Sequence, residues 1–265
     1  MTRFDGRVAF VTAGATGIGF ATARALAAAG ARVMISSLRE DEAKLVEAAQ
    51  RLGEGAEYVT CDVREDGEVD AAVAATVDRF GGLDLAFNCA GTGTYESIRE
   101  QSTEDFVENI ETTLLGTFRC LRAEANLMAE RGGGAIVNVS SIAASVTHPW
   151  MAGYCSAKAG VNMLTRCAAE EFGPYGIRVN GVMPGAIRTP MASMLYDYDV
   201  SREEFFRLMA IERIGEPDDV ANMAVFLLSE EAAWVTGQIV AVDGGITIGK
   251  GPNLVPLFQE LAEDA

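Results

Sequence analysis

Histidine is almost absent from this sequence, because its 265 residues include a single one, His148. A metal site built from several histidines is therefore excluded, we expect no bound metal, and a catalytic triad that depends on histidine is disfavoured. Cysteine is also sparse, since five scattered residues form an odd count and no CxxC pair. We expect reduced thiols, as in the cytoplasm, and no complete disulfide framework.

Long apolar runs and positive charge are lacking too. No stretch approaches the roughly 18 apolar residues of a membrane-spanning helix, and the segment 1–5 lacks the pattern of a signal peptide. The 38 acidic residues outnumber the 21 Lys and Arg, for a net charge of -17. An acidic chain repels phosphate backbones and anionic membrane surfaces. We therefore predict a cytoplasmic protein that acts on a small molecule, with neither nucleic acid nor membrane as a partner.

Short β-branched runs alternate with longer helical segments along the whole chain. The pattern predicts strands at residues 7–12, 32–36, 56–60, 83–87, 135–140, 178–182 and 238–242, and helices at 17–29, 40–52, 65–80, 103–131, 152–172 and 217–229. This alternation predicts an α/β fold: one doubly wound, Rossmann-like domain over residues 1–265, with a parallel sheet of about seven strands and helices on both faces. The tail at 246–265 shows only a short helical pattern, at 254–261.

A glycine-rich turn, Thr12 to Gly19, joins the first predicted strand to the first helix. Glycines at such a junction let the backbone approach a pyrophosphate, and the helix N-terminus offers free N–H groups. The alternative is a glycine-rich turn without a ligand. The predicted cofactor contacts in this turn are Gly14, Thr16, Gly17, Ile18 and Gly19.

The end of the second strand indicates which dinucleotide binds. No acid ends the strand; instead Ser37 and Arg39 are suited to a 2′-phosphate, so we predict NADP, with NAD still possible. The neighbouring Glu40 and Asp41 weaken this preference, and Arg39 is equally well explained as a solvated charge. The ends of the third and fourth strands add four predicted contacts: Asp62, Val63, Asn88 and Gly91. Asp62 alone is more often a helix cap than a ligand.

Tyr154 and Lys158 are four residues apart, so they lie on one face of a predicted helix. A tyrosine is a reluctant acid or base at neutral pH, because its reference pKa is about 10. An adjacent ammonium group stabilises the phenolate and lowers that pKa, and an oxidised nicotinamide acts in the same direction. Ser141 follows the fifth strand, where its hydroxyl is able to stabilise charge on a substrate oxygen. On a surface helix the same pair would have no function.

Together these motifs resemble the short-chain dehydrogenase/reductase family over nearly all of residues 5–245. The resemblance rests on the glycine-rich turn, the Asn88–Gly91 turn, Ser141 with the Tyr154/Lys158 pair, the segment 179–185 and the segment 243–245. It implies hydride transfer between a nicotinamide and an alcohol or carbonyl, with Ser141, Tyr154 and Lys158 as catalytic residues. It also implies a homotetramer built partly through the helices at 103–131 and 152–172. The further cofactor contacts that it implies are Ala90, Tyr154, Lys158, Pro184, Gly185, Ile187 and Thr189.

Three positions depart from the family pattern. Ala13 replaces the first motif glycine, which we expect to cost little if its φ is negative. Cys89 is a small substitute for an asparagine. Thr113 stands where the family has an asparagine that helps hold a water beside the lysine, so we assign Thr113 a catalytic role through its hydroxyl. Asn109, one turn earlier, is an alternative, and both residues are equally well explained as ordinary helix positions.

The segment 189–211 resembles the variable substrate loop of the family and is rich in Met and aromatic residues. Such a lining suits a hydrophobic or ring-shaped substrate, although a lid helix packed on the body explains it as well. The predicted substrate contacts are Ser141, His148, Trp150, Tyr154 and Met191. The competing hypotheses are a catalytically weak nucleotide-binding sensor of the same fold and a structural subunit of a mixed complex; the direction of the reaction stays open.

Overall fold

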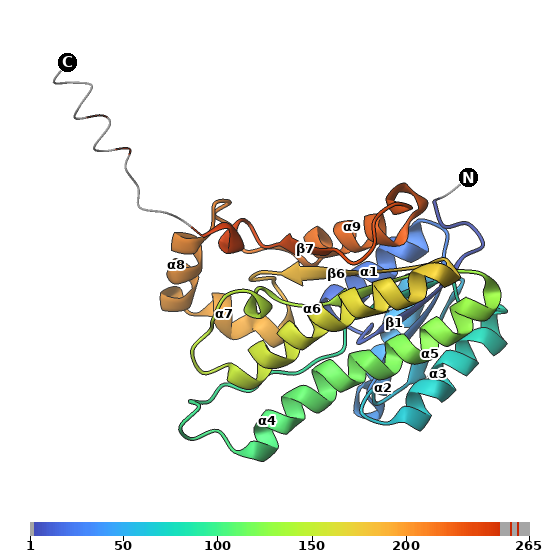
Figure 1. The fold of residues 1–265 in the computed structure, drawn as a ribbon, viewed down its shortest axis with the longest axis horizontal. Coiled ribbons are helices and arrows are strands. Elements are labelled where there is room, and N and C mark those ends of the chain that lie inside the picture. Colours follow the sequence, from blue (N-terminus) through green and yellow to red (C-terminus); the bar gives the residue numbers. More distant parts are fainter. Residues whose placement is uncertain (1–2, 250–254, 256–258, 260–265) are drawn as a thin grey trace.

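Seven parallel strands form one sheet in the computed structural model, which describes residues 3–249 together with residues 255 and 259. The strand order is β3-β2-β1-β4-β5-β6-β7. Figure 1 shows the sheet with the helices packed around it. The strands are β1 Val8–Thr12, β2 Arg32–Ser37, β3 Ala56–Thr60, β4 Leu85–Asn88, β5 Gly134–Val139, β6 Ile177–Pro184 and β7 Ile239–Val242. The predicted α/β fold with a seven-stranded parallel sheet is therefore confirmed.

The helices fill the crossovers, as the alternating pattern predicts. Their bounds are α1 Gly17–Ala28, α2 Glu42–Leu52, α3 Asp66–Phe80, α4 Thr103–Asn109, α5 Gly116–Arg131, α6 Ala152–Phe172, α7 Ser193–Asp197, α8 Asp199–Leu208 and α9 Pro217–Leu228. Across the described residues, none of these helices has the length and apolar character needed to span a membrane. The helical pattern at 254–261 falls almost entirely outside the described residues.

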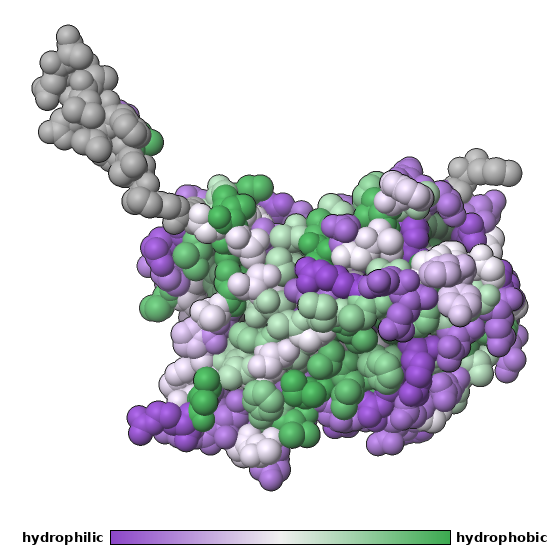
Figure 2. All heavy atoms as spheres, viewed as in Figure 1, coloured by the Kyte–Doolittle hydropathy of each residue, from purple (hydrophilic) through white to green (hydrophobic). Residues whose placement is uncertain are grey.

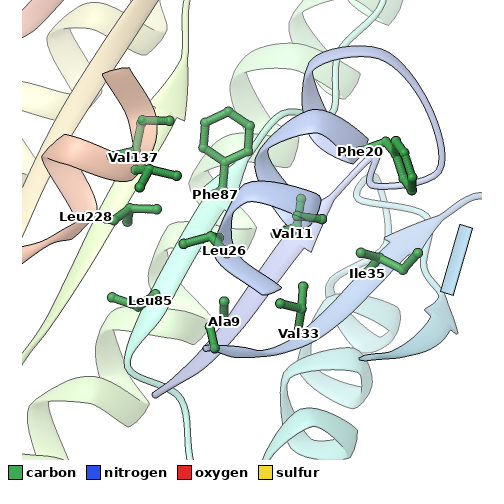
Figure 3. Packing of buried hydrophobic residues seen from close by; sticks show 14 of the residues in the cluster. Ala9, Val11, Phe20, Leu26, Val33, Ile35, Leu85, Phe87, Val137 and Leu228 are labelled. Carbon is green, nitrogen blue, oxygen red and sulfur yellow. The ribbon is translucent and has the colours of Figure 1, made fainter. Parts of the chain in front are cut away.

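Side chains of β1 alternate between two cores, one on each face of the sheet. Ala9 and Val11 pack with α1, α2 and α9, whereas Val8 and Phe10 pack with α3, α5 and α6. Figure 3 shows the first of these cores, where Phe87 and Leu26 meet across the sheet and α1. Both faces are covered, which explains why the strands are almost continuously apolar. Burial of a phenylalanine such as Phe87 contributes roughly 1.5–3 kcal/mol.

The direction of the crossovers reverses between β1 and β4, which are hydrogen-bonded neighbours. β2 and β3 extend the sheet on one side of β1, while β5, β6 and β7 extend it on the other. In open α/β sheets, ligands bind at the carboxyl ends of the strands beside such a reversal. The turn after β1, Thr12–Gly19, and the turn after β4, Asn88–Gly91, both lie there.

The predicted single helix at 103–131 is instead three segments. Between α4 and α5 the residues Ile110–Leu115 form a π-helical turn, which shifts the register of the side chains along the helix. Such turns are frequent at functional sites and leave little trace in the apolar pattern. Thr113 lies within this turn and is completely buried.

The substrate loop at 189–211 folds into α7 and α8, which cover the end of β6. An apolar cluster holds this cover to the body, with Ile142 and Met209 buried and Phe205 and Tyr196 packed against them. The Tyr196 hydroxyl also donates to the carbonyl of Thr189 at 2.7 Å. The loop therefore packs on the body as a cover, and through Phe205 it also forms part of a cavity wall.

Candidate active site

A cavity of about 270 Å³ opens at the carboxyl end of the sheet, between the turn after β1 and the cover formed by α7 and α8. It brings together three segments far apart in sequence: the glycine-rich turn, the loop after β5 with the start of α6, and the segment after β6. The lining residues are Ala13, Thr16, Gly17, Ile18, Cys89, Gly91, Gly93, Tyr95, Val139, Ser140, Ser141, Ile142, Ala143, His148, Met151, Tyr154, Lys158, Pro184, Gly185, Ala186, Ile187, Thr189, Pro190, Met191, Ala192 and Phe205.

Ser141 and Tyr154 both line this cavity, and the Ser141 side chain lies close enough to Tyr154 to lower its pKa. Ser141 follows β5, and its hydroxyl oxygen also accepts from the backbone N–H of Ala143 at 3.2 Å. Tyr154 projects from the first turn of α6, and a Cβ on Gly93 would lie only 3.1 Å from its ring. Two hydroxyl groups from different elements therefore lie close together in one cavity, as transfer of a proton to a carbonyl oxygen requires.

Lys158 lies one helical turn beyond Tyr154 and is buried. Its Nζ donates to the carbonyl of Val139 at 2.7 Å and lies 5.7 Å from the centre of the Tyr154 ring. Burial lowers the pKa of Lys158 to about 8. The ammonium group is thus held at the face of the ring by the end of β5, rather than bonded to the phenol oxygen.

The protein's own groups do not lower the pKa of Tyr154. Burial raises this pKa to about 12, and the hydrogen bond from Ser141 only partly offsets the rise. The expectation that Lys158 by itself makes the phenol more acidic is therefore wrong for the protein alone. The cost of removing a charge from water exceeds the attraction of an ammonium group that is engaged elsewhere.

The π-helical turn brings Thr113 close to Lys158, although Thr113 does not line the cavity. A Cβ on Gly91 would lie 3.3 Å from the Thr113 Oγ1 and 3.4 Å from the Lys158 Nζ, so both groups border the same small space. Thr113 already exchanges hydrogen bonds with the backbone of Thr92, at 3.2 Å in each direction. Its catalytic role stays a prediction, but its location beside the lysine is the one that the family pattern implies.

Asn109 does not replace the missing asparagine. Its amide nitrogen donates to the Thr94 hydroxyl and to the Asp105 carbonyl, both at 2.8 Å, and its oxygen accepts from the Thr94 backbone at 3.3 Å. The side chain is completely buried and fully occupied with the loop after β4. This alternative is therefore excluded by the hydrogen bonds that Asn109 already makes.

Some residues of the glycine-rich turn pack against the protein, whereas others line the cavity. Gly14 and Gly19 face the protein rather than the cavity: a Cβ on Gly14 would lie 2.7 Å from Ile35, and one on Gly19 would lie 2.2 Å from the Ala13 carbonyl oxygen. Ala13 has φ of 50°, so the condition under which alanine costs little is not met. An L-residue in this left-handed region is strained by roughly 1–2 kcal/mol.

The remaining parts of the turn fit a dinucleotide. Thr16, Gly17 and Ile18 line the cavity, and among the described residues no side chain caps the N-terminus of α1 and no acid lies in its first turn. Free N–H groups at a helix N-terminus suit a pyrophosphate. Across the cavity, the predicted contacts Pro184, Gly185, Ile187 and Thr189 form the wall after β6.

Asn88 is turned into the core. It is 2% exposed, and its Nδ2 donates to the Glu124 carboxyl at 2.9 Å and to the Asn138 amide oxygen at 3.0 Å. A cofactor contact through this side chain is therefore not supported. Ala90 lies outside the cavity lining, and its N–H donates to the Thr12 hydroxyl at 3.1 Å, which fixes the turn that carries Gly91 into the cavity.

Asp62 and Val63 follow β3 and also lie outside the cavity. The carboxylate of Asp62 accepts from the backbone and guanidinium of Arg64, and that contact lowers its pKa. Val63 is buried, and a Cβ on Gly116 would lie 2.7 Å from its side chain. Both stay predictions as cofactor contacts, but each has a structural role of its own.

Ser37 and Arg39 stand at the end of β2. The Ser37 hydroxyl donates to Asp41 at 3.3 Å, and Asp41 is in turn paired with Lys44 at 2.6 Å. The Arg39 side chain is exposed and has no ion pair or hydrogen bond with any described residue. The cation that a 2′-phosphate requires is therefore free, and the nearby acid is partly neutralised.

Only some of the predicted substrate contacts line the cavity. His148 and Met191 line the cavity, but Trp150 does not: it has φ of 71° and is 61% exposed. Sequence reasoning missed Gly93, Tyr95 and Met151. Their positions, just past the Asn88–Gly91 turn and just before Tyr154, are the signal that would have found them.

Comparisons with known proteins agree with this geometry. A family model described as enoyl-(acyl carrier protein) reductase matches residues 12–247. The 2,5-dichloro-2,5-cyclohexadiene-1,4-diol dehydrogenase of Sphingobium indicum is 40% identical over 250 residues, which cover 93% of this chain and 99% of that protein. A cyclohexanol dehydrogenase of an Acinetobacter species is 38% identical over 247 residues, covering 92% of this chain and 96% of that protein. The solved structure of a short-chain type dehydrogenase/reductase from Mycobacterium ulcerans has a TM-score of 0.89 at 36% identity, and covers 97% of this chain and 96% of that one.

Proposed function

Because this chain belongs to the short-chain dehydrogenase/reductase family and is an NAD(P)-dependent oxidoreductase of alcohols and ketones, we propose that Ser141, Tyr154 and Lys158 catalyse its reaction on a ring-bearing secondary alcohol. The observation that carries the proposal is the convergence of the Ser141 and Tyr154 hydroxyls in a cavity whose floor is the glycine-rich turn. Such a pair suits a substrate oxygen that changes between alcohol and carbonyl.

Each of the three residues has one task in this proposal. Tyr154 gives its phenolic proton to the carbonyl oxygen during reduction and takes it back from the alcohol during oxidation. Ser141 donates a hydrogen bond to the same oxygen. Lys158 presents its ammonium group to the ring face of Tyr154. The nicotinamide, when bound, supplies the hydride in reduction and accepts it in oxidation.

Thr113 is assigned a supporting task. The Thr113 hydroxyl and the Lys158 Nζ border the same space beside Gly91. A threonine hydroxyl both donates and accepts a hydrogen bond, so one proton at a time is able to pass through it. We therefore assign Thr113 to the relay that returns protons to Lys158, in the position where the family has an asparagine.

The cofactor is proposed to be NADP. Arg39 offers an unpaired guanidinium at the end of β2, and Ser37 offers a hydroxyl beside it. The residues proposed to hold the rest of the dinucleotide are Gly14, Thr16, Gly17, Ile18, Gly19, Asp62, Val63, Ala90, Gly91, Tyr154, Lys158, Pro184, Gly185, Ile187 and Thr189. Asp41 opposes a 2′-phosphate, but its pairing with Lys44 weakens that opposition.

The substrate is proposed to be a small or medium ring. Ile142, Met191 and Phe205 give the wall beyond the Ser141–Tyr154 pair an apolar character, which suits a carbocycle. The names of the two relatives, a cyclohexadiene-diol dehydrogenase and a cyclohexanol dehydrogenase, support the same substrate class. An acyl-carrier partner is less well suited, because such proteins are acidic and this chain carries a net charge of -17.

We also propose a homotetramer in the cytoplasm, with the residues 1–265 acting as one domain. Figure 2 shows apolar side chains gathered over α5 and α6. Val107, Phe118 and Met163 are exposed by 51%, 40% and 56% on α4, α5 and α6. Contiguous apolar surface of this kind is typical of a subunit interface. Light scattering on the purified chain and on a Phe118→Glu, Met163→Glu double variant tests this association.

The decisive experiment on the chemistry is Tyr154→Phe, assayed with cyclohexanol and NAD or NADP. Removal of the phenol oxygen is expected to lower turnover by at least about 10²-fold, because a positioned acid-base group contributes that much. Binding of the dinucleotide should persist. Tyr175→Phe, at an exposed tyrosine beyond α6, is the matched control. Near-normal turnover in Tyr154→Phe contradicts the assignment of Tyr154. If the wild type binds the dinucleotide but turns over no alcohol or ketone, the protein is a nucleotide-binding sensor instead.

A further inference from the structure

Two polar side chains stand apart from the catalytic group in the cavity wall. His148 and Tyr95 line the cavity with the apolar residues Ile142, Met191 and Phe205. The hydroxyl of Tyr95 makes no hydrogen bond with any described residue, and this side chain is 43% exposed. Polar groups in an otherwise apolar pocket are the ones that orient a ligand. The reaction itself does not use these two side chains, so they are available to form hydrogen bonds with another group of the ligand.

The imidazole of His148 is held in one orientation. Its Nδ1 lies 3.1 Å from the carbonyl of Val146, which only accepts, so Nδ1 carries the proton and donates. In the neutral ring the other nitrogen, Nε2, is then an acceptor. No described residue donates to it. In this neutral form His148, which lines the cavity, has a lone pair on Nε2 that a hydroxyl satisfies and a ketone does not.

Tyr95 belongs to a loop that is tied to the His148 loop. The backbone N–H of Glu96 donates to the carbonyl of Trp150 at 2.8 Å, and the N–H of Met151 donates to the carbonyl of His148 at 3.2 Å. Tyr95 also lies close enough to Tyr154 to raise its pKa. The Tyr95 loop thus joins the reacting centre to the loop that carries His148, and the two loops form one side of the cavity.

We infer that His148, assisted by Tyr95, binds a second hydroxyl on the substrate ring, so that the preferred substrate is a cyclic diol rather than a simple cyclic alcohol. This inference rests on the proposed function, since one hydroxyl must still meet Ser141 and Tyr154. The second hydroxyl donates to the His148 Nε2, and the phenol of Tyr95 completes its hydrogen bonds. A ring without that hydroxyl displaces water from both groups without replacing its hydrogen bonds, which lowers affinity.

The test compares isosteric substrates. Wild-type kcat/KM is measured with 1,3- and 1,4-cyclohexanediol and with the matching 3- and 4-methylcyclohexanols, in which a methyl group replaces the second hydroxyl. We expect at least one diol to exceed its methyl partner by about tenfold or more, because a site that hydrogen-bonds a substrate hydroxyl rejects the analogue that lacks it. His148→Leu should reduce this ratio to about one. Tyr95→Phe should reduce it partly, and both should act mainly through KM.

Two further variants make the outcome decisive. His148→Gln retains a polar tip near the Nε2 position and should restore part of the preference, whereas Met191→Leu changes an apolar lining residue and should keep the wild-type ratio. Dinucleotide binding in each variant reports whether the fold is intact. Equal kcat/KM for diol and methyl partner in the wild type, or the wild-type ratio in a folded His148→Leu protein, overturns the inference. Failure of the wild type to oxidise any of the alcohols contradicts the proposed function instead.

Discussion

The amide nitrogen of Asn88 donates to the carboxyl group of Glu124 at 2.9 Å in the middle of the protein core. Glu124 is completely buried on α5, and burial raises its pKa to about 8. No other described group donates to its second oxygen, Oε1. The carboxyl group is therefore neutral in the folded protein at pH 7, and it fastens the end of β4, where the Asn88–Gly91 turn begins, to α5.

This burial predicts a stability that falls as pH rises. Glu124 has an ordinary pKa of 4.5, and about 8 when folded, so the unfolded chain loses the proton first and stability declines between these two values. The slope is at most about 1.4 kcal/mol per pH unit for one group. Glu124→Gln keeps a hydrogen-bonding side chain that does not ionise. Urea unfolding at pH 6, 7 and 8 should show a shallower decline for this variant than for the wild type.

The neighbouring thiols do not confuse this measurement. Burial raises the pKa of Cys61 to about 12 and raises that of Cys120 well above its usual value, so both stay neutral over the range used. Glu130→Gln, at an exposed position of the same helix, is the matched control. Parallel slopes for wild type and Glu124→Gln would show that Glu124 is not held neutral.

The location of the Lys158 ammonium group predicts how the reaction depends on pH. In the proposed mechanism alcohol oxidation uses Tyr154 as a base, and the pKa of this phenol is raised to about 12 by burial. The reactive phenolate is therefore scarce at neutral pH and increases with pH. We expect kcat/KM for oxidation to rise above pH 7 by less than about tenfold per unit, because Lys158, with a pKa of about 8, loses its positive charge in the same range. The kcat/KM for reduction should not rise.

Lys158→Met removes the cation and should lower oxidation by about 10²-fold or more below pH 8, where Lys158 is charged, and by less above it. Initial rates in both directions, with one substrate pair across a single buffer series, provide the measurement. Oxidation that is independent of pH from 7 to 10 would mean that the phenol is already ionised. Lys158 and the bound dinucleotide would then lower the pKa of Tyr154 by more than burial raises it.

Ala13 predicts a simple gain in stability. Its φ of 50° belongs to the region that favours glycine, at the position where the family has glycine. Ala13→Gly should therefore stabilise the protein by roughly 1 kcal/mol, or about 2–4 °C in Tm for a chain of this size. Ala15→Gly is the control, because its φ is negative and the change only adds freedom to the unfolded chain. A Tm that is unchanged or lower in Ala13→Gly contradicts the assigned strain.

The sheet and the grouping of Ser141, Tyr154 and Lys158 in one cavity were predictable because they follow from local sequence patterns. The predicted strand at 56–60 and helix at 152–172 agree with β3 and α6 to the residue, and the four-residue spacing of Tyr154 and Lys158 sets them on one face. The positions of Ser141, Gly17 and Gly91 follow from strand ends meeting at one edge of a parallel sheet.

Features that depend on long-range contacts were not predictable. The π-helical turn at Ile110–Leu115 keeps an apolar pattern that looks like an uninterrupted helix. The orientation of Asn88 is decided by Glu124, which is 36 residues away. The pKa of Tyr154 depends on how deeply the cover and the Tyr95 loop bury it, and the i, i+4 spacing contains no information about that burial.

Arg39 predicts the choice between the two dinucleotides. Its guanidinium is exposed and unpaired with the described residues, whereas the nearby Asp41 repels a phosphate. Arg39→Ala should weaken NADPH binding by about tenfold or more, because a charge-assisted hydrogen bond is lost, and should leave NADH binding nearly unchanged. Asp41→Asn should act in the opposite sense and strengthen NADPH binding.

Calorimetric titration of both dinucleotides into the three proteins measures these affinities, and equal wild-type affinity for NADPH and NADH would withdraw the NADP assignment. Raised salt should weaken NADPH more than NADH, since only the former depends on an exposed charge pair.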